Sequence, residues 1–197
     1  LKSDIINGGI AEVNTAKKSF SGLLQFFPYA VISGTDTICK GETTFLSVRL
    51  VYGTPPWRFS YSRDGKKAKT ISGITEREYM LEVEKEGTYK LTSVRDDNRY
   101  GFVSGEGEIV YSESPTATIS GGGTICEGAL ATLRVDLTGT PPFMIKYEND
   151  NSGSGTVDNI LSSPCFFGVG EAGEYTLTEI SDRYCNGTFS GSALVES

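Results

Sequence analysis

Residues 124–143 read TICEGALATLRVDLTGTPPF, and this stretch decides the fold because an earlier copy of it stands in the same chain. Residues 37–57 read TICKGETTFLSVRLVYGTPPW, with the same Thr-Ile-Cys opening and the same Gly-Thr-Pro-Pro segment before an aromatic residue. Gly87-Thr88-Tyr89 and Gly173-Glu174-Tyr175 keep the same separation, so a unit of about 86 residues occurs twice. The sequence therefore predicts two copies of one module.

Apolar and polar residues alternate with a period of two in both copies, at residues 46–50 and 57–61 and again at 131–137 and 143–147. This alternation is typical of strands with one buried face. Glycine, asparagine and aspartate mark turns between the runs, and helical patterning is missing. About seven short strands per unit predict an all-β fold of two tandem immunoglobulin-like antiparallel β-sandwiches.

The repeat also predicts the domain boundaries within the 197 residues. Residues 28–113 form the first Ig-like repeat and 114–197 the second, each large enough for a core of its own. Residues 1–27 have two interpretations. They are either the tail of a preceding, truncated repeat, because Phe20-Ser21-Gly22 resembles Val103-Ser104-Gly105, or an irregular arm packed on the first module.

Charge and hydropathy exclude two classes of partner. The net charge is −7 and the 18 lysines and arginines form no stripe interleaved with aromatic residues, so binding to nucleic acid is not expected. No apolar run approaches the length that crosses a bilayer, so we expect no membrane span in this chain.

Three aromatic residues have a structural and an alternative interpretation. The Gly-x-Tyr-x-Leu patterns around Tyr89 and Tyr175 predict tyrosine corners, in which the phenol bonds back to the backbone, and the alternative is a buried core tyrosine. Trp57 lies on the inward phase of its strand, which favours a core position over a platform for stacking a ligand.

Residues that could carry catalysis or bind a metal are sparse. The chain has no histidine, and Cys165 lies on the inward phase of a core strand, so it is interpreted as a buried thiol. The four cysteines are too far apart in sequence for a zinc site. The oxygen-rich stretches 96–98 and 148–151 do not fit an EF-hand, and solvated turns are favoured over calcium sites. We therefore expect no enzyme, no metal and no cofactor.

A set of residues in the second copy carries a family resemblance, namely Thr118 to Gly121, Ile125-Cys126, Leu137 to Pro142, Tyr175 to Leu177, Ile180 to Asp182, Cys185 and Phe189 to Gly191. The set resembles the Ig-like tandem repeats of large secreted and cell-surface proteins of Bacteroidetes. It is more distantly similar to the luminal Ig-like repeats of the fungal pore-membrane nucleoporin, with a cysteine before the second strand, a Gly-x-x-Pro turn and an Asp-x-x-Cys ending. Both resemblances imply an architectural role in an oxidising compartment.

The resemblance also implies how the cysteines pair. In the second module, Cys126 and Cys185 match the disulfide of the resembled family. Arg99 stands where the first module would have the second cysteine, so Cys39 is expected to be a free thiol. Cys165, interpreted above as a buried thiol, is expected to be free as well. A bond between Cys39 and Cys165 would join the edge of one domain to the core of the other, which disulfide geometry makes improbable.

Three functions follow as hypotheses. The first is a non-catalytic extracellular or cell-surface module that acts as a structural spacer or in adhesion, with neighbouring repeats of a longer chain as possible partners. The second is a module that binds an unknown protein or glycan, for which the candidate exposed aromatics are Tyr100 with Phe102, and Tyr111. The third is an enzyme, which no sequence feature favours. The expected location is extracellular or at the cell surface.

Overall fold

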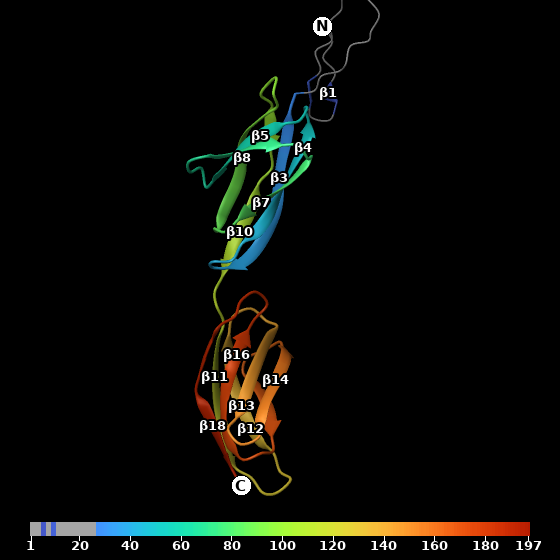
Figure 1. Ribbon diagram of the computed structural model, residues 1–197. Coiled ribbons are helices and arrows are strands. Elements are labelled where there is room, and N and C mark those ends of the chain that lie inside the picture. The colour runs from blue at the N-terminus through green and yellow to red at the C-terminus, as the bar shows by residue number, and fades with distance from the viewer. Residues whose placement is uncertain (1–4, 7–8, 11–26) are drawn as a thin grey trace, which may run out of the picture. The chain divides into compact units, whose positions relative to one another are not determined.

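The computed structural model describes residues 5–6, 9–10 and 27–197, and these residues cluster in two compact units (Figure 1). One unit holds the described residues up to Asp36 together with Gly41–Val110, and the other holds Thr37–Lys40 together with Tyr111–Ser197. The second unit thus begins three residues before the expected boundary and includes a short segment of the first repeat. The two interpretations of residues 1–27 lie mostly outside the described residues. Of this segment the structure describes the paired strands β1 (Ile5–Ile6) and β2 (Gly9–Ile10), and Phe27.

The first repeat forms a mostly antiparallel sandwich whose strands follow the order β6-β5-β8-β10-β3-β4-β7, with β9 pairing in parallel with β3. The strands are β3 (Tyr29–Cys39), β4 (Thr44–Tyr52), β5 (Trp57–Arg63), β6 (Lys69–Ile74), β7 (Glu78–Val83), β8 (Gly87–Arg95), β9 (Phe102–Ser104) and β10 (Gly107–Ser112).

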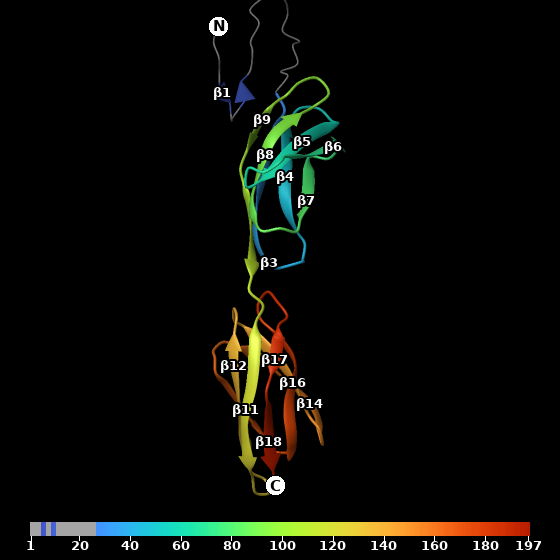
Figure 2. The same ribbon diagram turned by 90° about the vertical axis from the view of Figure 1, so that its left-hand side faces the viewer.

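The second repeat has the same topology, in the order β14-β13-β16-β18-β11-β12-β15 with β17 pairing with β11 (Figure 2). Its strands are β11 (Thr116–Thr124), β12 (Ala131–Thr138), β13 (Phe143–Asn149), β14 (Gly153–Ile160), β15 (Cys165–Val169), β16 (Gly173–Ser181), β17 (Thr188–Ser190) and β18 (Ser192–Glu196).

Strand β11 changes partner along its length. Residues 116–121 pair antiparallel with β12, whereas residues 122–124 pair in parallel with β18. The change takes place at Gly121-Gly122-Gly123, where all three residues have positive φ. A Cβ on Gly122 would lie 2.1 Å from the carbonyl oxygen of Leu194, so only glycine allows this close crossing.

The cores lie where the alternation places them. In β12, Leu133 and Val135 are fully buried, while Thr132 and Arg134 are exposed. In the first unit, Trp57 is buried in the core, which agrees with the favoured interpretation of that residue. Burying a valine or leucine side chain contributes about 1.5–3 kcal/mol each. The prediction of two tandem Ig-like β-sandwiches is confirmed.

Candidate functional site

An aspartate holds the turn that follows β16 in the second unit. Asp182 Oδ1 accepts hydrogen bonds from the backbone N–H groups of Tyr184 at 2.8 Å and of Cys185 at 2.7 Å. Asp182 Oδ2 accepts a third bond from the N–H of Thr140 at 2.8 Å. A Cβ on Gly139 would lie 2.7 Å from the same oxygen. One carboxylate therefore fixes both the Asp-x-x-Cys turn and the Gly-Thr-Pro-Pro segment beside it.

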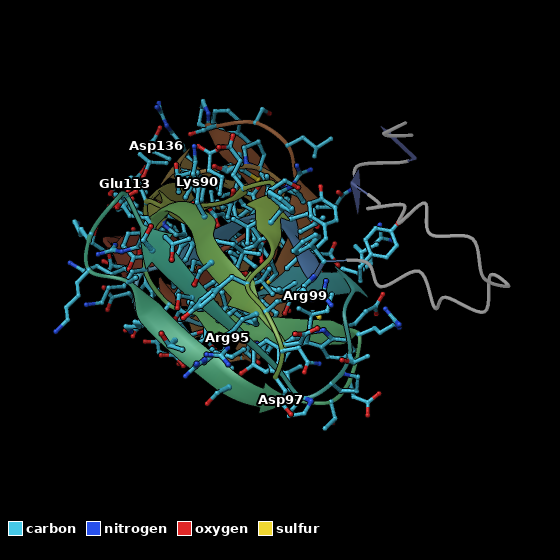
Figure 3. All side chains as sticks on the ribbon, turned by 90° about the horizontal axis from the view of Figure 1, so that it is seen from above. Lys90, Arg95, Asp97, Arg99, Glu113 and Asp136 are labelled. Carbon is cyan, nitrogen blue, oxygen red and sulfur yellow. A yellow bond between two sulfur atoms is a disulfide. The ribbon has the colours of Figure 1, made fainter. Side chains whose placement is uncertain are left out.

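The first unit contains the same turn with a different fourth residue. Asp96 Oδ1 accepts bonds from the N–H groups of Asn98 and Arg99, both at 2.9 Å, and Oδ2 accepts one from Thr54 at 3.3 Å. Arg99, labelled in Figure 3, thus occupies the position that Cys185 has in the second unit. Both modules therefore contain this turn, and they differ in its fourth residue.

Asp96 is buried, and the N–H groups around it set its protonation. Burial by itself would raise the pKa of Asp96, but the backbone hydrogen bonds from Arg99, Asn98 and Thr54, together with the charge of Arg99, hold the pKa below its ordinary value. The folded state therefore favours the carboxylate. This stabilisation is present above the unfolded-state pKa of about 4 and is lost as the pH falls through the lowered folded pKa.

We expect Asp96→Asn to lower the free energy of unfolding of the first unit at pH 7 by about 1–2 kcal/mol, because charge-assisted hydrogen bonds are weakened. The difference between wild type and variant should begin to shrink below about pH 4, where the carboxyl protonates in the unfolded state, and should go on shrinking as the pH falls through the lowered folded-state pKa. Urea denaturation at pH 7 and pH 3 measures both values. Asp97→Asn, at an exposed position of the same turn, is the matched control, and an equal effect of the two substitutions would contradict the assignment.

A disulfide joins the last residue of β3 to this turn. Cys39 is bonded to Cys185, with a Cα–Cα distance of 5.6 Å that lies within the usual range for disulfides. Cys185 is 3% exposed. Both cysteines belong to the second compact unit, because Thr37–Lys40 clusters with it.

The expected bond between Cys126 and Cys185 is wrong in this structure, and so is the expectation that Cys39 is free. Cys126 is an exposed free thiol. The reason is the register of β11, in which Thr116 lies opposite Thr188 of β17, close in sequence to Cys185. Cys126 stands ten residues beyond Thr116, about 30 Å away along an extended strand, so the two cysteines occupy opposite ends of the module.

Cys165 is the other free thiol of the chain. It begins β15 opposite Val135 and is half-buried rather than fully enclosed. Burial raises the pKa of the Cys165 thiol, which lowers the fraction of reactive thiolate.

Both tyrosines of the Gly-x-Tyr-x-Leu pattern are buried and bond to the backbone four residues upstream. Tyr89 donates its hydroxyl hydrogen to the carbonyl oxygen of Lys85 at 2.7 Å, and Tyr175 donates to that of Glu171 at 2.8 Å. A phenol that bonds back across the turn before its own strand is the arrangement of a tyrosine corner.

We expect Tyr175→Phe to lower the free energy of unfolding of the second unit by about 1 kcal/mol, because the ring stays packed while the hydrogen bond to Glu171 is lost. Tyr184→Phe removes a hydroxyl from an exposed ring of the same unit and should change stability much less. Equilibrium denaturation of the two variants decides the point, and equal values would argue against the corner.

The aromatic residues named for binding differ in exposure. Tyr100 is 65% exposed and Phe102 is 52% exposed, while Tyr111 is half-buried. The guanidinium of Arg95 lies 5.2 Å from the centre of the Tyr100 ring, and the Phe27 and Phe102 rings meet edge to face. Tyr100 and Phe102 belong to the first unit, whereas Tyr111 belongs to the second. We call the exposed side chains of Tyr100 and Phe102 the aromatic surface.

Metal and membrane features are missing from the described ranges. Within them, no group of three or more aspartate, glutamate or cysteine side chains is placed to hold a metal ion. The same residues contain no helix of the length and hydropathy that crossing a membrane requires.

Comparisons with known proteins identify the module. The sequence matches the family described as "Nucleoporin POM152, Ig-like domain" at residues 33–106 and again at residues 116–193. It is 31% identical over 172 residues to the nucleoporin pom152 of Schizosaccharomyces pombe, and the match covers 77% of this chain and 14% of that protein. Among solved structures, the human OSCAR ligand-binding domain matches with 14% identity and a TM-score of 0.35, covering 84% of this chain and 95% of that one.

These matches correct one expectation and leave two others without support. The expected extracellular or cell-surface location is wrong, because the matching family and the matching relative are nucleoporins. The resemblance to Bacteroidetes proteins and the role in adhesion receive no support. The comparisons support the other resemblance, to the pore-membrane nucleoporin.

Proposed function

This chain belongs to the family of Ig-like domains of the nucleoporin POM152, and from that premise we propose that it is a non-catalytic structural segment on the luminal side of the nuclear pore membrane. The observation that carries the proposal is that both repeats match the family separately. The chain spans about one seventh of the curated relative, so the role of the whole protein is part of the proposal.

The bonds of the repeated residues support a structural role. In both copies, the turn aspartates Asp96 and Asp182 and the tyrosines Tyr89 and Tyr175 bond to the backbone of their own module. Groups used in this way stabilise the fold. The Cys39–Cys185 disulfide supports a luminal location, because such bonds persist in oxidising compartments such as the ER lumen.

The location is tested by tagging the protein that carries this chain, in its own cells. We expect the tag at the nuclear rim, protected from added protease until detergent opens the membranes. An alkylating reagent added before lysis should leave Cys39 and Cys185 unmodified, because both are oxidised in the disulfide. A tag that is digested without detergent, or one found at the cell surface, would refute the proposed location.

A second candidate function is a module that binds a protein or glycan through the aromatic surface. The exposure of Tyr100 next to Phe102 is the observation that favours it. The test measures binding of the chain to a glycan array. This function is supported if the double variant Tyr100→Ala with Phe102→Ser no longer binds, while the control Phe166→Ser, on an exposed site of the second unit, still binds. Identical binding by both variants, or no binding, would reject it for glycans.

A further inference from the structure

Cys126 repeats the local setting of Cys39. Each cysteine follows an isoleucine that packs inward, since Ile38 is buried and Ile125 contacts the core of the second unit. Each is followed two residues later by a glycine with positive φ, 97° at Gly41 and 78° at Gly128. Cys39 is the last residue of β3, and Cys126 lies two residues beyond the end of β11. Cys39 is in a disulfide, whereas Cys126 is exposed and free.

The partner of Cys39 shows what such a cysteine bonds to. Cys185 is the fourth residue of a turn whose conformation Asp182 fixes through two backbone hydrogen bonds. The turn is part of the module, because the first unit builds it with the same bonds around Asp96. There the fourth residue is Arg99, which has no sulfur, so that copy of the turn offers Cys126 no partner.

We propose that Cys126 forms a disulfide with the turn cysteine of a further Ig-like module of this kind, one that carries the Asp-x-x-Cys turn. The end of the last strand supports this choice of partner. Glu196 of β18 lies opposite Thr124, and its carbonyl oxygen accepts a hydrogen bond from the N–H of Ile125 at 2.8 Å. A module joined after β18 would therefore begin next to Cys126. The inference rests on the proposed function only in requiring an oxidising compartment.

The bond needs a disulfide oxidant, for which oxidised glutathione serves. The Cys126 thiolate attacks one sulfur of oxidised glutathione, which forms a mixed disulfide and releases one glutathione thiolate. The thiolate of the turn cysteine then attacks Cys126 Sγ and releases the second glutathione. The two protein thiols lose two protons and two electrons in total, and oxidised glutathione is reduced to two molecules of glutathione.

The test extends the full chain after Ser197 by a second copy of its own residues 112–197, which supplies a further module with its turn cysteine. Cys165→Ser in both copies and Cys126→Ser in the added copy remove the other thiols. The purified protein is equilibrated with a buffer of reduced and oxidised glutathione, its free thiols are alkylated, and its disulfides are mapped by mass spectrometry. We expect a bond between Cys126 and the cysteine that repeats Cys185 in the added copy, with loss of alkylation at Cys126.

Two matched variants of the extended chain serve as controls. Changing the turn cysteine of the added copy to arginine, as in the first unit, should restore full alkylation of Cys126. Moving that cysteine two positions earlier in the turn should do the same, because the turn no longer presents it. Alkylation of Cys126 in the unmodified extended chain, a symmetric bond between Cys126 residues of two chains, or equal bonding by the shifted cysteine would each overturn the inference. These outcomes do not depend on where the protein lies in the cell, so they are distinct from failure of the proposed location.

Discussion

Replacing Cys39 and Cys185 together by serine is expected to lower the free energy of unfolding of the second unit by about 2–5 kcal/mol. The bond joins residues separated by 146 positions in the sequence, so it closes a long loop. When the second unit unfolds with the bond intact, its chain stays tied to the end of β3. Removing the bond frees that chain, and the gain in conformational entropy favours the unfolded state.

Denaturation of the two-serine variant and the wild type, each without reductant, measures this loss. Cys126→Ser is the matched control, because it removes an exposed free thiol from the same unit and should change stability by less than about 0.5 kcal/mol. Adding reductant should bring the wild type to the stability of the two-serine variant and leave that variant unchanged. Equal stability of wild type and two-serine variant without reductant would show that the bond contributes nothing to this unit.

Leu133→Ala is expected to lower the free energy of unfolding of the second unit by about 3–5 kcal/mol, because it opens a cavity in a packed core. Leu133 is fully buried in the middle of β12, opposite Phe167 of β15. The loss combines the transfer free energy of the removed methyl groups with the cost of the space they leave.

Leu130→Ala makes the same chemical change three residues earlier in the chain. Leu130 is 69% exposed, so its truncation should cost less than about 0.5 kcal/mol. Urea denaturation of both variants compares the two positions directly. Similar losses at the two leucines would mean that the strand does not face the core as described.

The alternating residues of the two copies predicted the strands and their inward faces, because a period of two places alternate side chains on opposite faces whatever the partner strand is. Leu133 and Val135 are buried as the pattern requires, and Thr132 and Arg134 beside them are exposed. The pattern also placed Tyr89 and Tyr175 where the structure finds their hydrogen bonds to the backbone. These features depend on residues that are close in sequence.

The aspartate turns were visible in the sequence only as oxygen-rich or Asp-x-x-Cys stretches. Asp96 lies in one of the oxygen-rich stretches, yet its carboxylate accepts hydrogen bonds from three backbone N–H groups. The repeat contains a signal for this structural role. Asp96 stands three residues before Arg99 and Asp182 stands three residues before Cys185, so the two aspartates occupy the same position in the two copies.

Repetition and alternation are properties of the chain read along its length, so they already predict two copies of one β-sandwich module. Which cysteines bond depends instead on the folded arrangement. A disulfide requires two Cα atoms within about 4.4–6.8 Å, and this depends on which ends of strands the fold brings together. Strand β11 separates Cys126 from Cys185 by its whole length, whereas the fold brings the end of β3 to the turn that carries Cys185.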